Sequence, residues 1–430
     1  MGKRKQKKAD QFDSSDADSV SSSSTAFSEL SLAHETERVD SQEFTLEKCL
    51  DALYEKRGST REKALIGLVS AFEGNVLLDF IESRCITLLH MYLNSIKRGS
   101  AKEVCLAARA IGFLAITAGN EDITHEIMEE SISSLSRALI SGPDAVRTSV
   151  LDCLAIVTFA GSNNWEETET VMKIMWDIIH PKSLSKAGTI TKPSSAVLVG
   201  ALSAWSFLLT TMTGWRVDLD IWIEVITFLC NLLENGDRAV RIAAGEAIAV
   251  IFEIVVAGKL SNITSDLEST EGTPSKPKWL IYLMSLKEKI ILLVSGLSME
   301  AGGKGIDKKC LNTQRDTFQK IYDYLKEGEQ PETSLKLSKK QGVLTTSTWT
   351  ELIQLNFLKH FLGSGFLKHA QDNEFLHNVF DLTADAENGL STTQKRIFRS
   401  FGDRERTQVL NKDRQMAQLR KGAIVFADED

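Results

Sequence analysis

The 430-residue chain has few residues that interrupt or cross-link a fold. Its six prolines lie in or beside the breaks between helical segments, where helices start or stop. Its six cysteines form no CxxC pair, which favours buried free thiols in a reducing compartment over a metal site or a disulfide framework. No apolar run approaches the roughly 18 residues that a membrane span needs. We therefore expect an intracellular, soluble protein with no membrane partner.

Motifs for catalysis and for ligand binding are also missing. The sequence contains no HExxH, GxSxG, kinase or dinucleotide-binding signature. The Gly-Gly-Lys-Gly run at 302–305 lacks the spacing of a phosphate-binding loop, so we interpret it as a turn. His360, His369 and His377 lack a zinc spacing and have no cysteine nearby, so we interpret them as helix-surface or core histidines.

Four glutamates lie on predicted helices with no acid or base at a spacing that indicates a catalytic pair. They are Glu224, Glu234, Glu246 and Glu253. Charged, solvent-facing helix surfaces explain all four. The sequence thus predicts a binding protein rather than an enzyme, with no cofactor, no metal and no small-molecule substrate.

Charge separates the body of the chain from its ends. Residues 1–8 carry a formal charge of +5, and residues 9–43 carry −8. Near the other end, residues 395–421 carry +6 and the acidic tail 422–430 carries −3. The body between them therefore holds the whole formal net charge of −8. Because an acidic body repels phosphate backbones, any contact with nucleic acid should involve the basic ends.

Both basic ends are candidate contacts with a polyanion or a partner. The first is compatible with a nuclear-import signal, a nucleic-acid arm or merely a soluble terminus, and comprises Lys3, Arg4, Lys5, Lys7 and Lys8. Apolar residues are interspersed in the second, which is compatible both with a helix that docks on RNA or protein and with a solvated tail. Its members are Lys395, Arg396, Arg399, Arg404, Arg406, Lys412, Arg414, Arg420 and Lys421.

Five segments share one pattern, a helix whose small residues are followed by a bulky apolar face. They span residues 61–72, 103–117, 146–160, 195–210 and 240–255. Their equivalent positions are Gly67, Ala110, Cys153, Ala201 and Ala247, at successive offsets of 43, 43, 48 and 46 residues. This spacing is typical of armadillo and HEAT repeats. Second amphipathic helices are predicted between them, such as 164–180 and 217–234.

The small residues have a packing explanation. In a solenoid, each repeat buries its apolar face only against its neighbours, and helices approach most closely where side chains are small. The five equivalent positions are therefore predicted to lie where successive repeats stack. We also expect Asp237 to cap the helix that follows it, and Ser59 with Glu62 to form a capping box.

The sequence predicts an all-α fold with no convincing alternating strand. We expect an armadillo/HEAT-like helical-repeat solenoid and then a small helical C-terminal domain, with a disordered N-terminal tail rich in Ser and Asp. Two exposed loops are expected at 182–194 and 267–278. The predicted boundaries are 1–43 for the tail, 44–328 for the repeats, 329–347 for a linker, 348–421 for the C-terminal domain with its basic segment, and 422–430 for an acidic tail.

Residues 371–382, QDNEFLHNVFDL, resemble a characteristic block of the interferon-related developmental regulators. The segments 59–72, 241–253 and 307–325 resemble other blocks of that family in the same order. The block contains a motif whose role we expect to be structural, formed by Asn373, Glu374, Phe375, Leu376, Asn378, Val379 and Phe380.

The resemblance implies a non-enzymatic regulator of gene expression in the nucleus and cytoplasm. Such a protein would act as a transcriptional co-regulator that binds proteins of the co-repressor or chromatin type. One branch of the family is associated with inactive ribosomes, so a translational regulator that binds ribosomal RNA through the basic C-terminal segment is the alternative. The resemblance supplies no catalytic residues.

Overall fold

The computed structural model describes residues 45–181, 192–212, 219–256, 278–301, 308–338 and 342–382. The described residues from Lys48 onward belong to one compact unit, which contains the fold described below. The expected tail and most of the two expected loops lie outside the described residues. No helix in the described ranges is both long and apolar enough to cross a membrane.

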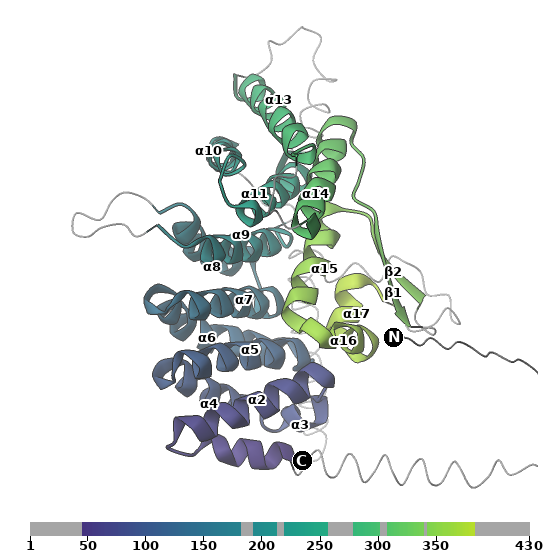
Figure 1. The fold of residues 1–430 in the computed structure, drawn as a ribbon. Helices are drawn as coiled ribbons and strands as arrows, with labels where there is room; N and C mark the ends of the chain where they lie inside the picture. Colours follow the sequence, from purple (N-terminus) through teal and green to yellow (C-terminus); the bar gives the residue numbers. More distant parts are fainter. Residues whose placement is uncertain are drawn as a thin grey trace, which may run out of the picture. The chain divides into compact units, whose positions relative to one another are not determined.

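One row of helices repeats through the array, and each member packs against the next (Figure 1). We call it the inner row. Its helices are α2 (Gly58–Gly74), α5 (Ala101–Thr117), α7 (Asp144–Gly161), α9 (Ser195–Leu209), α11 (Arg238–Ile251) and α14 (Lys308–Glu327). The first five coincide with the five patterned segments of the sequence, apart from the last residues of the fourth and fifth segments, so the predicted repeats are confirmed.

A second row alternates with the first along the chain. It consists of α4 (Cys85–Arg98), α6 (Glu121–Ser141), α8 (Trp165–Ile179), α10 (Leu219–Leu232) and α13 (Lys278–Ser298), and the short α3 (Leu78–Glu82) precedes α4. Each of these five packs against the inner helix that follows it. The described residues thus form the predicted helical-repeat solenoid of the armadillo type.

Side-chain caps start several of these helices. The Asp237 carboxylate accepts hydrogen bonds from the backbone N–H groups of Ala239 and Val240, as predicted. The predicted capping box at Ser59 is wrong, because α2 begins at Gly58 without a side-chain cap. Glu62 instead accepts a hydrogen bond of 2.7 Å from the Ser100 hydroxyl at the start of α5.

The inner helix α11 shows what its small residues do. A Cβ on Gly245 would lie 2.8 Å from the Phe318 ring, so the glycine lets α14 approach closely. The helix is not regular over the whole predicted span, because a π-helical turn, η1 (Phe252–Val256), follows Ile251. Such turns are frequent at functional sites, and this one carries Glu253.

The C-terminal part begins with an antiparallel hairpin, which corrects the expectation of no strand. Strands β1 (Thr333–Ser338) and β2 (Gly342–Thr346) pair Leu335 with Leu344, and Leu344 is buried. The pair occupies most of the stretch predicted as a linker. After it come α15 (Trp349–Leu362), the short 3-10 helix η2 (Gly363–Gly365), α16 (Phe366–Asp372) and α17 (Glu374–Phe380).

Candidate functional site

Helices α15 to α17 lie along the inner row (Figure 1). Aromatic rings form much of this contact: Phe357 of α15 stacks on Phe207 of α9, with ring centroids 4.2 Å apart. Phe361 lies 5.3 Å from Phe113 of α5, centroid to centroid. The same Phe361 ring occupies the space where a Cβ on Gly112 would be. The C-terminal helices therefore fit closely against the bulky ends of the inner helices.

The start of α15 is held by Glu253 of η1. Its carboxylate accepts hydrogen bonds from the backbone N–H of Trp349 (2.9 Å) and from the N–H and hydroxyl of Thr350 (both 2.7 Å). The first N–H groups of a helix have no partner within it, and a negative charge there is favourable. The interpretation of Glu253 as solvent-facing is therefore wrong, because this glutamate joins the repeat array to the C-terminal helices.

A second polar attachment lies at α16 and α17. The buried His369 ring hydrogen bonds through Nε2 to the backbone carbonyl of Phe72, at 2.7 Å. Burial lowers the pKa of His369, which favours the neutral ring. Asn373 is also buried; its amide donates to the carbonyl of Ile116, and its oxygen accepts from the N–H of Phe375. These two residues tie the last helices to α2 and α5.

The remaining motif residues surround Asn373. Leu376 and Phe380 are buried, and the Phe375 ring meets Phe159 of α7 edge-on at 5.9 Å between centroids. Glu374 is exposed, while Asn378 and Val379 are half-buried.

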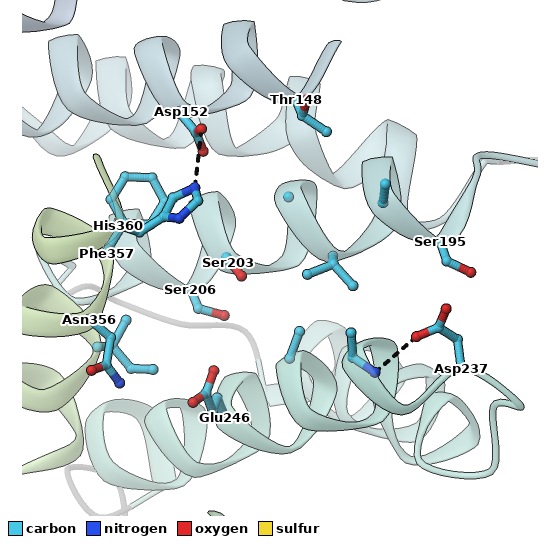
Figure 2. Close-up of a pocket in the computed structure, with 16 residues that line it drawn as sticks. Thr148, Asp152, Ser195, Ser203, Ser206, Asp237, Glu246, Asn356, Phe357 and His360 are labelled. Atoms are coloured by element: carbon cyan, nitrogen blue, oxygen red, sulfur yellow. Dashed lines mark hydrogen bonds and ion pairs between the residues drawn. The ribbon is translucent and has the colours of Figure 1, made fainter. Parts of the chain in front are cut away.

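A groove of about 820 Å³ lies where α7, α9, α11 and α15 meet (Figure 2). Small side chains line much of it, and the lining from the inner row comprises Thr148, Asp152, Ser195, Ala196, Val199, Gly200, Ser203, Ser206, Asp237, Ala239, Ala243 and Glu246. Ile353, Asn356, Phe357 and His360 line it from α15. Its volume lies within the roughly 300–1,000 Å³ range of ligand pockets.

The titratable groups of the groove are mainly acidic. Asp152 and His360 face each other 3.5 Å apart, and the hydrogen bond to Asp152 raises the pKa of His360. Asp237 is engaged as the cap of α11. Burial raises the pKa of Glu246 from 4.5 to about 7. Among its described lining residues the groove thus offers three carboxyl groups and one imidazole.

Two groups in the groove lack a partner among the described residues. Ser206 is 2% exposed, and its buried hydroxyl makes no hydrogen bond there. Glu246 is half-buried, and no hydrogen bond or ion pair joins its carboxylate to the described part of the chain. Figure 2 shows the Ser206 hydroxyl on the side of α9 that faces Glu246 on α11. The prediction of a solvated Glu246 is therefore wrong, whereas Glu224 and Glu234 are exposed as expected.

The five predicted stacking positions lie on the inner helices. Ala110, Cys153, Ala201 and Ala247 are fully buried, while Gly67 is half-buried with the Cys49 sulfur beside it. The structure describes neither basic cluster nor the Gly-Gly-Lys-Gly run. They lie outside the described residues, so the roles of both clusters stay predictions.

The histidines lie in separate environments. His369 is in the core, His360 is on the exposed side of α15, and His377 bonds through Nε2 to the carbonyls of Ala370 and Gln371. Within the described ranges, no group of three or more His, Cys, Asp or Glu side chains is arranged to hold a metal ion.

Stacked helix pairs whose inner row carries an open groove define a helical-repeat protein of the armadillo type. The family model of the interferon-related developmental regulator matches residues 13–326, and that of the interferon-related protein conserved region matches 373–418. Because the first covers well over half of the chain, the chain belongs to the interferon-related developmental regulator family.

Curated relatives agree with this assignment. Interferon-related developmental regulator 1 of Sus scrofa is 25% identical over 345 residues, which are 79% of this chain and 71% of the relative. The Homo sapiens protein of the same name has the same identity and coverage. Interferon-related developmental regulator 2 of Mus musculus is 26% identical over 368 residues, 83% of this chain and 78% of the relative.

Solved structures resemble the chain only loosely. A designed armadillo repeat protein, YIII(Dq)4CqI, aligns with a TM-score of 0.40 and 15% identity over 64% of this chain and 99% of its own. An engineered protein aligns with a TM-score of 0.37 and 18% identity over 57% of this chain and 98% of its own. The fold assignment rests on the helix packing described above.

Proposed function

We propose that the chain is a non-enzymatic regulator of gene expression whose repeat array binds regulatory proteins of the co-repressor or chromatin type. The observation that carries this proposal is the groove beside α15, which stays open while the chain's own helices cover the adjoining part of the inner row. An accessible groove on a rigid repeat array is the usual form of a protein-binding surface. The family supports a regulatory role.

Purification of the intact chain from separated nuclei and cytoplasm tests this function. We expect co-repressor or chromatin components to be recovered from nuclei with the wild-type chain. The variant Ser203→Arg, which places a large side chain in the groove, should recover less of them. Ser70→Arg, on the exposed surface of α2, is the matched control and should behave as wild type. The absence of such components from the wild-type preparation would contradict the proposal.

A second candidate function is ribosome-associated translational regulation. The observation that favours it is that the matched conserved region, 373–418, contains most of the basic C-terminal segment. Such a segment can bind ribosomal RNA through its phosphates. Sucrose-gradient sedimentation at low salt tests it with a variant in which Arg404, Arg406, Arg414 and Arg420 are replaced by Gln. Co-sedimentation with ribosomes that is absent, or unchanged in the variant, would rule the second function out.

A further inference from the structure

The groove beside α15 has the charge of a cation site rather than an anion site. Asp152, Asp237 and Glu246 line it, and among its described lining residues His360 is the one group that can carry a positive charge. That imidazole already faces Asp152 at 3.5 Å. Phosphate or carboxylate ligands would be repelled, and a cationic group would be attracted.

The strongest place for a cation is the half of the groove that contains Glu246. At the opposite end, α9 and α11 begin, and the positive ends of their dipoles offset the charge of Asp237, which is engaged as a cap. Glu246 has neither a helix N-terminus nor a counter-ion beside it among the described groups. Burial of such a carboxylate without a partner is unfavourable and is relieved by a cation that accompanies it.

Ser206 gives independent evidence for a ligand at this place. Serine hydroxyls on helices commonly bond to a carbonyl in the preceding turn, yet the buried Ser206 hydroxyl has no partner in the described structure. A buried polar atom without a hydrogen bond costs about 1–3 kcal/mol. Because this hydroxyl faces Glu246 across the groove (Figure 2), one ligand group could bond to both.

We propose that the groove binds an extended, basic segment of a partner protein, with one Lys or Arg side chain seated between Glu246 and Ser206. This inference rests on the proposed function as a protein-binding scaffold and names the chemistry of the partner. The ammonium or guanidinium group donates to both oxygens, which satisfies the two unpartnered groups at once. The neutral polar side chains of Ser203 and Asn356 remain for the segment's backbone, and the small Gly200 and Ala243 leave room for it.

Fluorescence anisotropy with the full-length chain tests the proposal. The probe is a labelled Ser/Gly peptide with Lys or Arg at alternate positions, and the same peptide with Glu at those positions is the ligand control. We expect saturable binding of the basic probe alone. Glu246→Gln and Ser206→Ala, each of nearly unchanged size, should each weaken it about tenfold or more. Thermal unfolding of each variant checks that the fold persists.

A matched pair of charge changes separates the groove from the general acidity of the body. Glu224→Gln with Glu234→Gln removes two exposed acids of the same type from outside the groove and should leave affinity within about twofold. Failure of the basic probe to bind, or equal loss in this control and in Glu246→Gln, would overturn the proposal.

The chain's own basic segment is the competing occupant. In full-length protein with Arg404, Arg406, Arg414 and Arg420 replaced by Gln, probe affinity should not change. A rise of about tenfold in the affinity for the probe would show that the chain's own basic segment occupies the groove, and would overturn the proposal of a partner segment. If nuclear partners are recovered equally with wild type and with Glu246→Gln, the proposed function stands and this inference fails.

Discussion

The two halves of the central inner helices α7 and α9 are used differently. Toward their C-terminal ends the inner helices carry Phe113, Phe159 and Phe207, and α15 to α17 cover these rings. Toward their N-terminal ends, α7, α9 and α11 carry small or polar residues such as Gly200 and Ala243, which line the open groove. The change from small to bulky residues along one helix therefore marks the boundary between an open surface and a covered one.

The covered half should lose the most stability when a ring is removed. Phe361→Ala should lower the free energy of unfolding by about 3–5 kcal/mol, because the ring fills the space against Gly112 and Phe113. Urea unfolding measures this loss. Leu367→Ala, on the exposed face of α16, is the control and should change stability by less than about 0.5 kcal/mol. A Phe361→Ala effect no larger than that control would show that the rings do not hold the covered half.

The buried polar attachment should have the next largest effect. Asn373→Ala leaves the carbonyl of Ile116 without its donor and removes the cap of α17, so we expect a loss of about 2–4 kcal/mol. Asn378→Ala, at a half-buried position within α17, is the matched control and should cost less stability. Equal losses for the two variants would contradict a special role for Asn373.

The open half should lose stability as pH rises, whereas the covered half, in which burial lowers the pKa of His369, should lose stability as pH falls. The pKa of Glu246 is raised from 4.5 to about 7 in the folded chain, so the folded state binds this proton more tightly than the unfolded state. This contribution to stability is complete below about pH 4.5 and is lost as pH rises through about 7. At about pH 8, Glu246→Gln should therefore stabilise the chain by on the order of 2 kcal/mol.

Unfolding of wild type and Glu246→Gln at about pH 5 and about pH 8 measures this difference. The other titratable groups that line the groove are Asp152, Asp237 and His360, and they are unchanged in the variant. Identical pH slopes for the two proteins would show that Glu246 does not carry the effect.

The hydrogen bonds from the start of α15 to Glu253 should make the smallest contribution to the free energy of unfolding. Glu253→Gln keeps one acceptor but removes the charge at the start of α15, which should cost about 1–2 kcal/mol. Amide hydrogen exchange should accelerate in the first turn of α15 more than in α7. Uniform acceleration in both helices would indicate general destabilisation instead.

The repeats were predicted well, because the small residues that mark each repeat lie within a single helix and recur at a nearly constant spacing along the chain. The cap at Asp237 needed only its own neighbours, for the same reason. The hairpin was missed because each strand offers few apolar residues and pairing partners such as Leu335 and Leu344 are set by tertiary contact. Glu253 was misjudged because its partners lie 96 and 97 residues away in sequence.

The groove could not be predicted either, because α15 closes one side of it and lies far along the sequence from the inner helices that form the other sides. One signal was available: Ala239, Ala243 and Glu246 follow each other at helical spacing, which places the acid on the same face as the small residues. The adjoining stripe of small residues, which includes Ala243 and Ala247, predicted close approach by another group, namely the next repeat. It did not reveal that the approaching group could be a ligand.

The position of α15 to α17 in the chain has a consequence for synthesis. A ribosome makes the inner helices first, and the residues that contact Phe72 and Phe113 from the C-terminal helices, Phe361 and His369, are made last. Until then, several hundred residues of folded repeats present uncovered aromatic ends, which makes them prone to aggregation and dependent on chaperones. A chain truncated before α15 should therefore be much less soluble than the full-length chain, because the aromatic ends of its inner helices stay uncovered.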